Sequence, residues 1–227
     1  MKKYYYNYLL LLKNINNYGI FEVLKIIFYE IFFIIRFKDF NSLSYDEKES
    51  DTYEHAIGKN TYDTPYIPTP FYFLKILCLF FKKAKINNFL ILDLGCGYSR
   101  VEYFFSAHFK TNFFGVDINK KIIQKLKKKK INNTFFLNLN LRNEKNIELL
   151  VSKTRKIKKK KKLVVFFSDS FDPKLLKKIL IKLSNKLEFY CILINVKNTK
   201  YLSKKYKTLF NKEFKNPNRN IKIFKIK

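Results

Sequence analysis

From residue 86 onward, short apolar segments alternate with segments whose apolar residues recur at helical spacing. Five apolar segments predict buried strands, at residues 89–94, 112–118, 134–139, 163–167 and 189–196. Two further runs, 208–214 and 221–226, flank a turn at Asn216 and Pro217 and predict a hairpin. Strands that alternate with helices are typical of a parallel sheet covered on both faces. The pattern therefore predicts an α/β fold with a doubly wound, mostly parallel, seven-stranded sheet and a C-terminal antiparallel hairpin.

An N-terminal helical extension is predicted ahead of this sheet, over residues 18–37. Its apolar positions at helical spacing are Phe21, Leu24, Phe28, Ile31 and Ile35, and its polar positions cluster on another side. The apolar stretches are too short, and the charges too many, for a membrane span. We expect the apolar stripe to pack on the domain or on a partner subunit. The alternative is peripheral contact with a membrane surface, because the helix is aromatic and flanked by basic residues.

The chain is predicted to divide after residue 61. Residues 39–64 are polar and contain turn-forming residues, which favours a linker. Prolines stand at positions 65, 68 and 70, so we expect an extended segment there. Thr69 is predicted to cap a helix that covers residues 71–83. Residues 1–61 thus form the helical extension and linker, and residues 62–227 the main domain.

Charge and cysteine content change this picture little. The formal charge is +29, but only five of the 47 basic residues are arginine. The excess of Lys, Asn, Ile, Phe and Tyr matches the A/T-rich codons of a biased genome, so nucleic acid is a less favoured partner. The three cysteines are far apart and none forms a CxxC pair, which predicts no disulfide, no metal site and a reducing, cytoplasmic location.

The candidate chemistry follows the first two strands. Gly95 and Gly97 stand on the turn that leaves the first strand, where a ligand can approach the backbone closely. Asp117, twenty positions later, ends the second strand, where a carboxylate can accept both ribose hydroxyls of an adenosine. A dinucleotide fingerprint would place a third glycine where Arg100 stands. Asp93, just before the glycines, suits a cationic ligand group such as a sulfonium-bearing amino acid.

The motifs Ile91-Leu92-Asp93-Leu94-Gly95-Cys96-Gly97 and FFGVDIN (113–119) resemble those of class I S-adenosylmethionine-dependent methyltransferases. The Tyr-x-Pro-Thr-Pro stretch at 66–70 resembles the lead-in of a group of small bacterial members. The resemblance spans residues 62–227. It implies a Rossmann-like fold, S-adenosyl-L-methionine as cofactor, and transfer of its methyl group to an unidentified acceptor, which is a protein side chain, an RNA base or a small amine.

The resemblance also implies roles for individual residues. The cofactor-binding residues it implies are Tyr66, Thr69, Asp93, Leu94, Gly95, Cys96, Gly97, Asp117, Ile118 and Asn140. The residues it implies for acceptor binding are Arg100, Ser168, Ser170 and Phe171, with Asp169 as the candidate catalytic base. Asn140 stands where the family has an acid, and residues 168–171 depart from its Asn-Pro-Phe. These departures leave open a second interpretation, a catalytically degenerate cofactor-binding or interaction module on the same fold.

Overall fold

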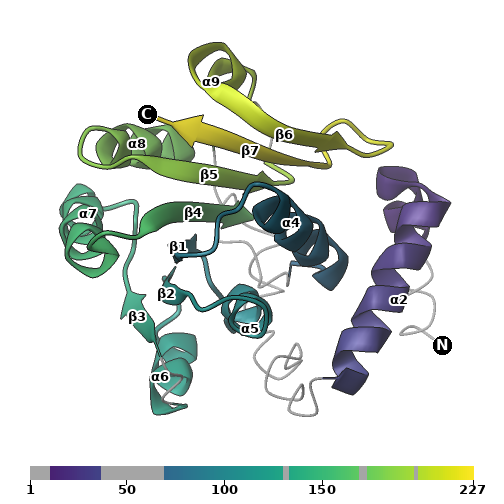
Figure 1. Ribbon diagram of the computed structural model, residues 1–227, viewed down its shortest axis with the longest axis horizontal. Helices are drawn as coiled ribbons and strands as arrows, with labels where there is room; N and C mark the ends of the chain where they lie inside the picture. The colour runs from purple at the N-terminus through teal and green to yellow at the C-terminus, as the bar shows by residue number, and fades with distance from the viewer. Residues whose placement is uncertain (1–10, 37–68, 130–132, 169–172, 197–198) are drawn as a thin grey trace, which may run out of the picture.

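A computed structural model describes residues 11–36, 69–129, 133–168, 173–196 and 199–227. Its centre is a seven-stranded sheet with the order β3-β2-β1-β4-β5-β7-β6 (Figure 1). The strands are β1 (Phe89–Leu94), β2 (Asn112–Asp117), β3 (Thr134–Asn138), β4 (Lys162–Ser168), β5 (Phe189–Ile194), β6 (Lys207–Glu213) and β7 (Asn220–Ile226). The first five are parallel, whereas β7 is antiparallel to both β5 and β6. The predicted sheet and its C-terminal hairpin are confirmed.

Helices cover both faces of the sheet. One face carries α7 (Glu144–Lys158), α8 (Pro173–Ser184) and α9 (Lys200–Lys205), and the other carries α4 (Phe71–Lys83), α5 (Arg100–Ser106) and α6 (Lys120–Lys128). Each face of the sheet has its own apolar core, and successive residues of a strand point alternately to one core and to the other. On β1, Leu90 and Leu92 join the α7–α8 side, while Phe89 and Ile91 join the α4–α5 side. Asp93 follows in the same alternation and so belongs to the side of α5.

Helix α2 (Ile20–Arg36) forms an outer layer against α4 at the edge of the molecule (Figure 1). It joins the core through Phe33, whose ring lies 5.0 Å from that of Phe71 and 5.1 Å from that of Phe104. The predicted apolar stripe, however, faces away from the domain. Phe21 is 76% exposed and Ile35 is 72% exposed. The other three residues of the stripe are also exposed, namely Leu24, Phe28 and Ile31. The expectation that this stripe packs on the domain is therefore wrong.

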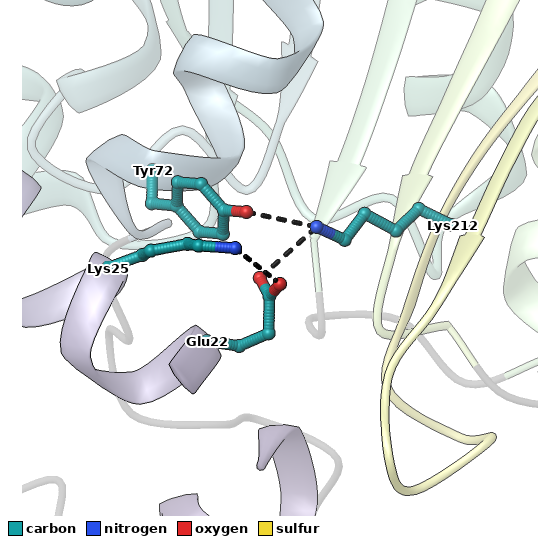
Figure 2. A network of polar contacts seen from close by, with 4 residues as sticks. All are labelled: Glu22, Lys25, Tyr72 and Lys212. Atoms are coloured by element: carbon teal, nitrogen blue, oxygen red, sulfur yellow. Dashed lines mark hydrogen bonds and ion pairs between the residues drawn. The ribbon is translucent and has the colours of Figure 1, made fainter. Parts of the chain in front are cut away.

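The polar residues of α2 explain its orientation. Figure 2 shows the Glu22 carboxylate accepting hydrogen bonds from Lys25 Nζ and from Lys212 Nζ, each at 3.1 Å. Lys212, on β6, also donates to the Tyr72 hydroxyl of α4 at 3.0 Å. Burial, followed by the neighbouring Glu22, raises the pKa of Tyr72 to about 12, so this hydroxyl stays protonated. Glu22 is thus paired with Lys212, and Glu30, the other glutamate of α2, is paired with Arg100 of α5. Because both acids face the domain, the apolar stripe faces outward.

Two local predictions differ from the structure. Pro70, not Thr69, occupies the N-cap of α4, and the Thr69 side chain makes no capping bond. The Glu30 carboxylate takes that role instead, accepting the Phe71 N–H at 2.8 Å. The sequence pattern also predicts a helix over residues 143–153, whereas α7 extends to Lys158, because no glycine or proline interrupts good helix formers there. Within the described residues, no helix is both long enough and apolar enough to cross a membrane.

Candidate functional site

The candidate site lies at the carboxyl ends of β1, β2 and β4. Strand β1 is flanked by β2 on one side and by β4 on the other. From β2 the chain continues to β3 at one edge of the sheet, and from β4 it continues to β5 in the opposite direction, so the strand order reverses at β1. In open parallel sheets, ligands bind at such a switch point, beyond the carboxyl ends of the strands. The loop 95–99 follows β1 here, Asp117 ends β2 and Ser168 ends β4. The topology therefore brings the sequence-predicted residues to one edge of the sheet.

The glycine loop is held by its backbone. Gly95 has a φ of 81° and Gly97 a φ of 49°, in the left-handed region that favours glycine. The N–H groups of Gly95 and Cys96 both donate to the carbonyl of Val116 on β2, at 2.8 and 3.1 Å. The loop is thus fastened to the neighbouring strand, and its glycines leave room for a ligand beside the main chain.

Asp117 is joined directly to this loop. Its Oδ2 accepts the Gly97 N–H at 2.9 Å and its Oδ1 accepts the Asn119 N–H at 2.8 Å. Burial raises the pKa of Asp117, while these backbone N–H bonds oppose the shift by stabilising the carboxylate. Each carboxylate oxygen keeps a second lone pair for a ligand hydroxyl. Ile118 follows with 49% of its surface exposed, as an apolar platform beside the carboxylate.

Asp93 belongs to a buried acidic pair that the sequence did not reveal. Glu102, in the first turn of α5, lies close enough to Asp93 for one carboxyl to hydrogen-bond the other when protonated. Burial is the main cause that raises the pKa of both groups, well above the usual value for Asp93 and to about 7 for Glu102. Among the described residues, Asp93 Oδ2 and both Glu102 oxygens have no hydrogen-bond partner of good geometry. An acid in a first helical turn is common, so its sequence position gave no signal.

The residue predicted for the adenine amino group is engaged elsewhere. Asn140 Oδ1, the atom predicted to accept from that amino group, accepts the Arg142 backbone N–H at 3.0 Å. Asn138, which the sequence analysis did not single out, contacts the backbone around Asp117. Its side-chain amide donates to the carbonyls of Asp117 and Ile118, at 3.0 and 2.7 Å, and so fixes the end of β2.

The acceptor side of the site is described only in part. The Thr69 hydroxyl lies 3.3 Å from that of Ser168, which joins the start of α4 to the end of β4. Arg100 is buried, and its Nη1 contacts Glu30 Oε2 at 2.8 Å and the Thr69 carbonyl at 3.4 Å. Sequence reasoning missed Glu30 because it stands 70 positions away, in a segment treated as separate. Four predicted site residues lie outside the described residues: Tyr66, Asp169, Ser170 and Phe171.

Thiol and metal chemistry find no support in the described part of the chain. Burial raises the pKa of Cys96 well above its ordinary value, and its Sγ donates to the Gly97 carbonyl at 3.7 Å. A buried thiol of this kind packs and does not act as a nucleophile. The described residues contain no group of three His, Cys, Asp or Glu side chains placed to hold a metal ion.

The fold is similar to that of solved methyltransferases. An RNA methyltransferase from Salinibacter ruber, in complex with S-adenosyl-L-homocysteine, has 12% sequence identity and a TM-score of 0.50, covering 70% of this chain and 94% of its own. A methyltransferase from Geobacter sulfurreducens has 11% identity and a TM-score of 0.51, covering 81% of this chain and 90% of its own. No family model matches the sequence, and no curated protein matches it. At this level of identity the similarity shows a shared Rossmann-like methyltransferase fold.

Proposed function

We propose that this chain is an S-adenosylmethionine-dependent methyltransferase whose acceptor is a protein side chain, an RNA base or a small amine. One observation carries the proposal: the Asp117 carboxylate accepts the Gly97 N–H at 2.9 Å. This bond sets a ribose-binding acid beside a glycine loop, at the sheet edge where ligands bind in this architecture. The fold shared with solved methyltransferases supports the same conclusion.

The residues at the site suit this cofactor. Asp93 Oδ2 is buried without a hydrogen-bond partner of good geometry among the described residues, and a cationic ammonium group is the partner that such an oxygen lacks. Asp117 has lone pairs for the ribose hydroxyls, and the half-exposed Ile118 offers an apolar surface for the adenine. The backbone of Leu94, Gly95, Cys96 and Gly97 would line the methionine end. Asn140 Oδ1 accepts the Arg142 N–H with one lone pair and has a second for the adenine amino group.

When bound, the cofactor supplies an already activated methyl group on its sulfonium, so the protein has little covalent chemistry to perform. Its contribution is to hold the acceptor in line and to exclude water. Thr69 and Ser168, whose hydroxyls lie 3.3 Å apart, suit the wall of the acceptor site. For an acceptor that carries a proton, we propose Asp169 as the base that removes it, with Ser170 and Phe171 contacting the acceptor.

Calorimetric titration of the full chain with S-adenosylmethionine, S-adenosylhomocysteine and NAD tests the cofactor assignment. We expect micromolar binding of the first two compounds and none of NAD, because the third glycine of the dinucleotide fingerprint is absent. Binding of NAD alone, or of none of the three, would contradict the proposal. The Asp117→Ala variant serves as the site control, since it should weaken binding of both sulfur compounds together.

Methyl transfer itself separates the enzyme from the second candidate, a cofactor-binding module without activity. The departures from the family pattern at Asn140 and at residues 169–171 are the observation that favours that candidate. Incubation with methyl-tritiated cofactor and separate pools of RNA, protein and small amines would identify the acceptor class. Label in one pool that disappears with Asp169→Asn, while calorimetry still detects the cofactor, would support the enzyme; binding without label in any pool would favour the module.

We also propose a reducing compartment such as the cytoplasm for this chain. The three cysteines, Cys78, Cys96 and Cys191, are buried and unpaired, which is the usual state of thiols in such a compartment.

A further inference from the structure

Helix α2 is oriented with its acids inward and its apolar residues outward. Glu22 and Glu30 are paired with Lys212 and Arg100 of the domain. The exposed large apolar residues of the helix are Ile20, Phe21, Leu24, Ile27, Phe28, Ile31, Phe32, Ile34 and Ile35, which we call the outer face of α2. A contiguous apolar surface of this extent on a folded domain marks a binding surface.

The charges around the outer face indicate what covers it. The exposed charged residues of the described N-terminal segment are all basic: Lys13, Lys25 and Arg36. Both acids of the segment are held by cations on the inner side, so no carboxylate of the described segment is exposed beside the apolar residues. An apolar face with basic residues around it is the pattern of a helix that lies in the headgroup region of an anionic membrane.

A second copy of the chain fits the same surface less well. Each copy carries a formal charge of +29, and the exposed charged residues around the outer face, within residues 11–36, are all basic, with Lys25 paired to Glu22. Two such faces repel each other, whereas an anionic surface attracts both the helix and the domain behind it. The apolar residues also argue against a polynucleotide, which binds through phosphate contacts to polar and basic side chains.

We propose that the outer face of α2 binds the surface of an anionic lipid bilayer and anchors the domain there as a peripheral protein. The helix lies at the edge of the molecule (Figure 1), where it contacts α4 and leaves its apolar stripe exposed. Phe21, Phe28 and Ile35 enter the boundary between headgroups and acyl chains. Arg36, at the end of the helix, remains at the level of the headgroups. This anchoring does not depend on the proposed methyl transfer.

The absence of tryptophan from the sequence provides a direct test. In the full chain, Phe28→Trp places one fluorophore on the outer face, and Leu149→Trp places one on the exposed side of α7, on the opposite side of the sheet. Vesicles of phosphatidylglycerol and phosphatidylcholine in equal amounts should shift the emission of the Phe28→Trp variant to shorter wavelength and leave that of the Leu149→Trp variant unchanged. Vesicles of phosphatidylcholine alone should bind roughly tenfold more weakly or worse, since the headgroup charge is then lost.

A paired substitution tests whether the outer face itself is responsible. Phe28→Glu combined with Ile35→Glu should reduce flotation with the anionic vesicles by roughly tenfold or more, whereas the matched pair Leu149→Glu and Ile181→Glu should not. Both pairs exchange exposed residues, and far-UV circular dichroism checks that each variant is folded. Three results would overturn the proposal: equal flotation of both pairs, an emission of the Phe28→Trp variant that is already blue-shifted without vesicles, or a dimer in sedimentation that only the first pair dissociates.

Discussion

Glu30 and Arg100 form an ion pair between the outer helix and the start of α5, with Glu30 Oε2 2.8 Å from Arg100 Nη1. The same carboxylate accepts the first N–H of α4 from Phe71, and the guanidinium lies over the Phe71 ring, 4.5 Å from its centroid. Arg100 also donates to the Thr69 carbonyl, beside the hydroxyl contact to Ser168. One salt bridge thus connects α2, α4 and α5 to the edge of the candidate site.

This connection predicts a strong effect of Glu30→Gln and of Arg100→Met on stability. Because the Arg100 side chain is only 7% exposed and that of Glu30 25% exposed, each change removes the counter-charge of a poorly solvated group and should cost about 2–4 kcal/mol in urea unfolding. The double variant should lose less than the sum of the two. Lys25→Met, which breaks an exposed pair with Glu22, is the control and should leave the free energy of unfolding nearly unchanged. Additive losses at Glu30 and Arg100 would show that the two residues act separately.

At the glycine loop, Asp117→Ala is expected to weaken binding of S-adenosylmethionine. The change removes the proposed ribose acceptor and leaves the Gly97 N–H without its present partner. The loss of charge-assisted hydrogen bonds is worth about 1.5–3 kcal/mol, or roughly 10- to 150-fold in the dissociation constant. Calorimetry measures this directly. Glu188→Gln, on the exposed surface, should bind as the parent does, and parental affinity in Asp117→Ala would refute the ribose assignment.

The acidic pair predicts that stability falls as pH rises. Burial raises the pKa of Glu102 from 4.5 to about 7, so between these values the folded chain holds a proton that the unfolded chain has released. The folded state is therefore favoured at pH 4.5 and loses this advantage as pH approaches 7. Glu102→Gln cannot ionise and should be more stable than the parent at about pH 8 by about 1–3 kcal/mol, with a smaller difference at about pH 5.

Asp93 keeps part of this pH dependence in the Glu102→Gln variant, because burial alone is the largest cause that raises its pKa. Urea unfolding of parent and variant at about pH 5 and about pH 8 measures the difference. A parent that gains stability relative to Glu102→Gln between these two values would contradict the buried pair.

Gly115 on β2 is predicted to tolerate no side chain. A Cβ atom there would lie 2.8 Å from Phe136 Cδ1 and 2.9 Å from Cys96 Sγ, closer than such atoms approach. Gly115→Ala should therefore cost about 1–3 kcal/mol, and the shift of Cys96 should also weaken cofactor binding. Phe136→Leu in the same chain vacates the ring position and should restore part of the stability. If Gly115→Ala is as stable as the parent, Gly115 does not lie as close to Phe136 and Cys96 as described.

The sheet and the placement of Gly97 and Asp117 at the ends of its first two strands could be predicted from the sequence because both depend on local patterns. Apolar strands mark the sheet, and the ends of neighbouring parallel strands meet at one edge. The direction in which α2 faces could not be predicted in this way. Periodicity identifies an apolar side of a helix, but it does not reveal that Glu22 and Glu30 find cations on β6 and α5.

Burial of charge was likewise hidden from the sequence. Glu102 stands in an ordinary first-turn position, and only the tertiary structure buries it beside Asp93. Asn140 was assigned by its place after β3, and the structure adds a local turn in which its oxygen accepts the Arg142 N–H. The proximity of Glu102 and Asp93, by contrast, depends on tertiary structure that the pattern of residues does not reveal.

The strand order β5-β7-β6 has a consequence for synthesis of the chain. Strand β7, the last of the described strands to be made, lies between two strands that leave the ribosome before it. Until residues 220–226 emerge, β5 has an open edge and β6 has no strand of this sheet to pair with. The sheet is therefore completed only after β7 has left the ribosome, and a ribosome that stalls before residue 220 holds a nascent chain with an exposed, aggregation-prone strand.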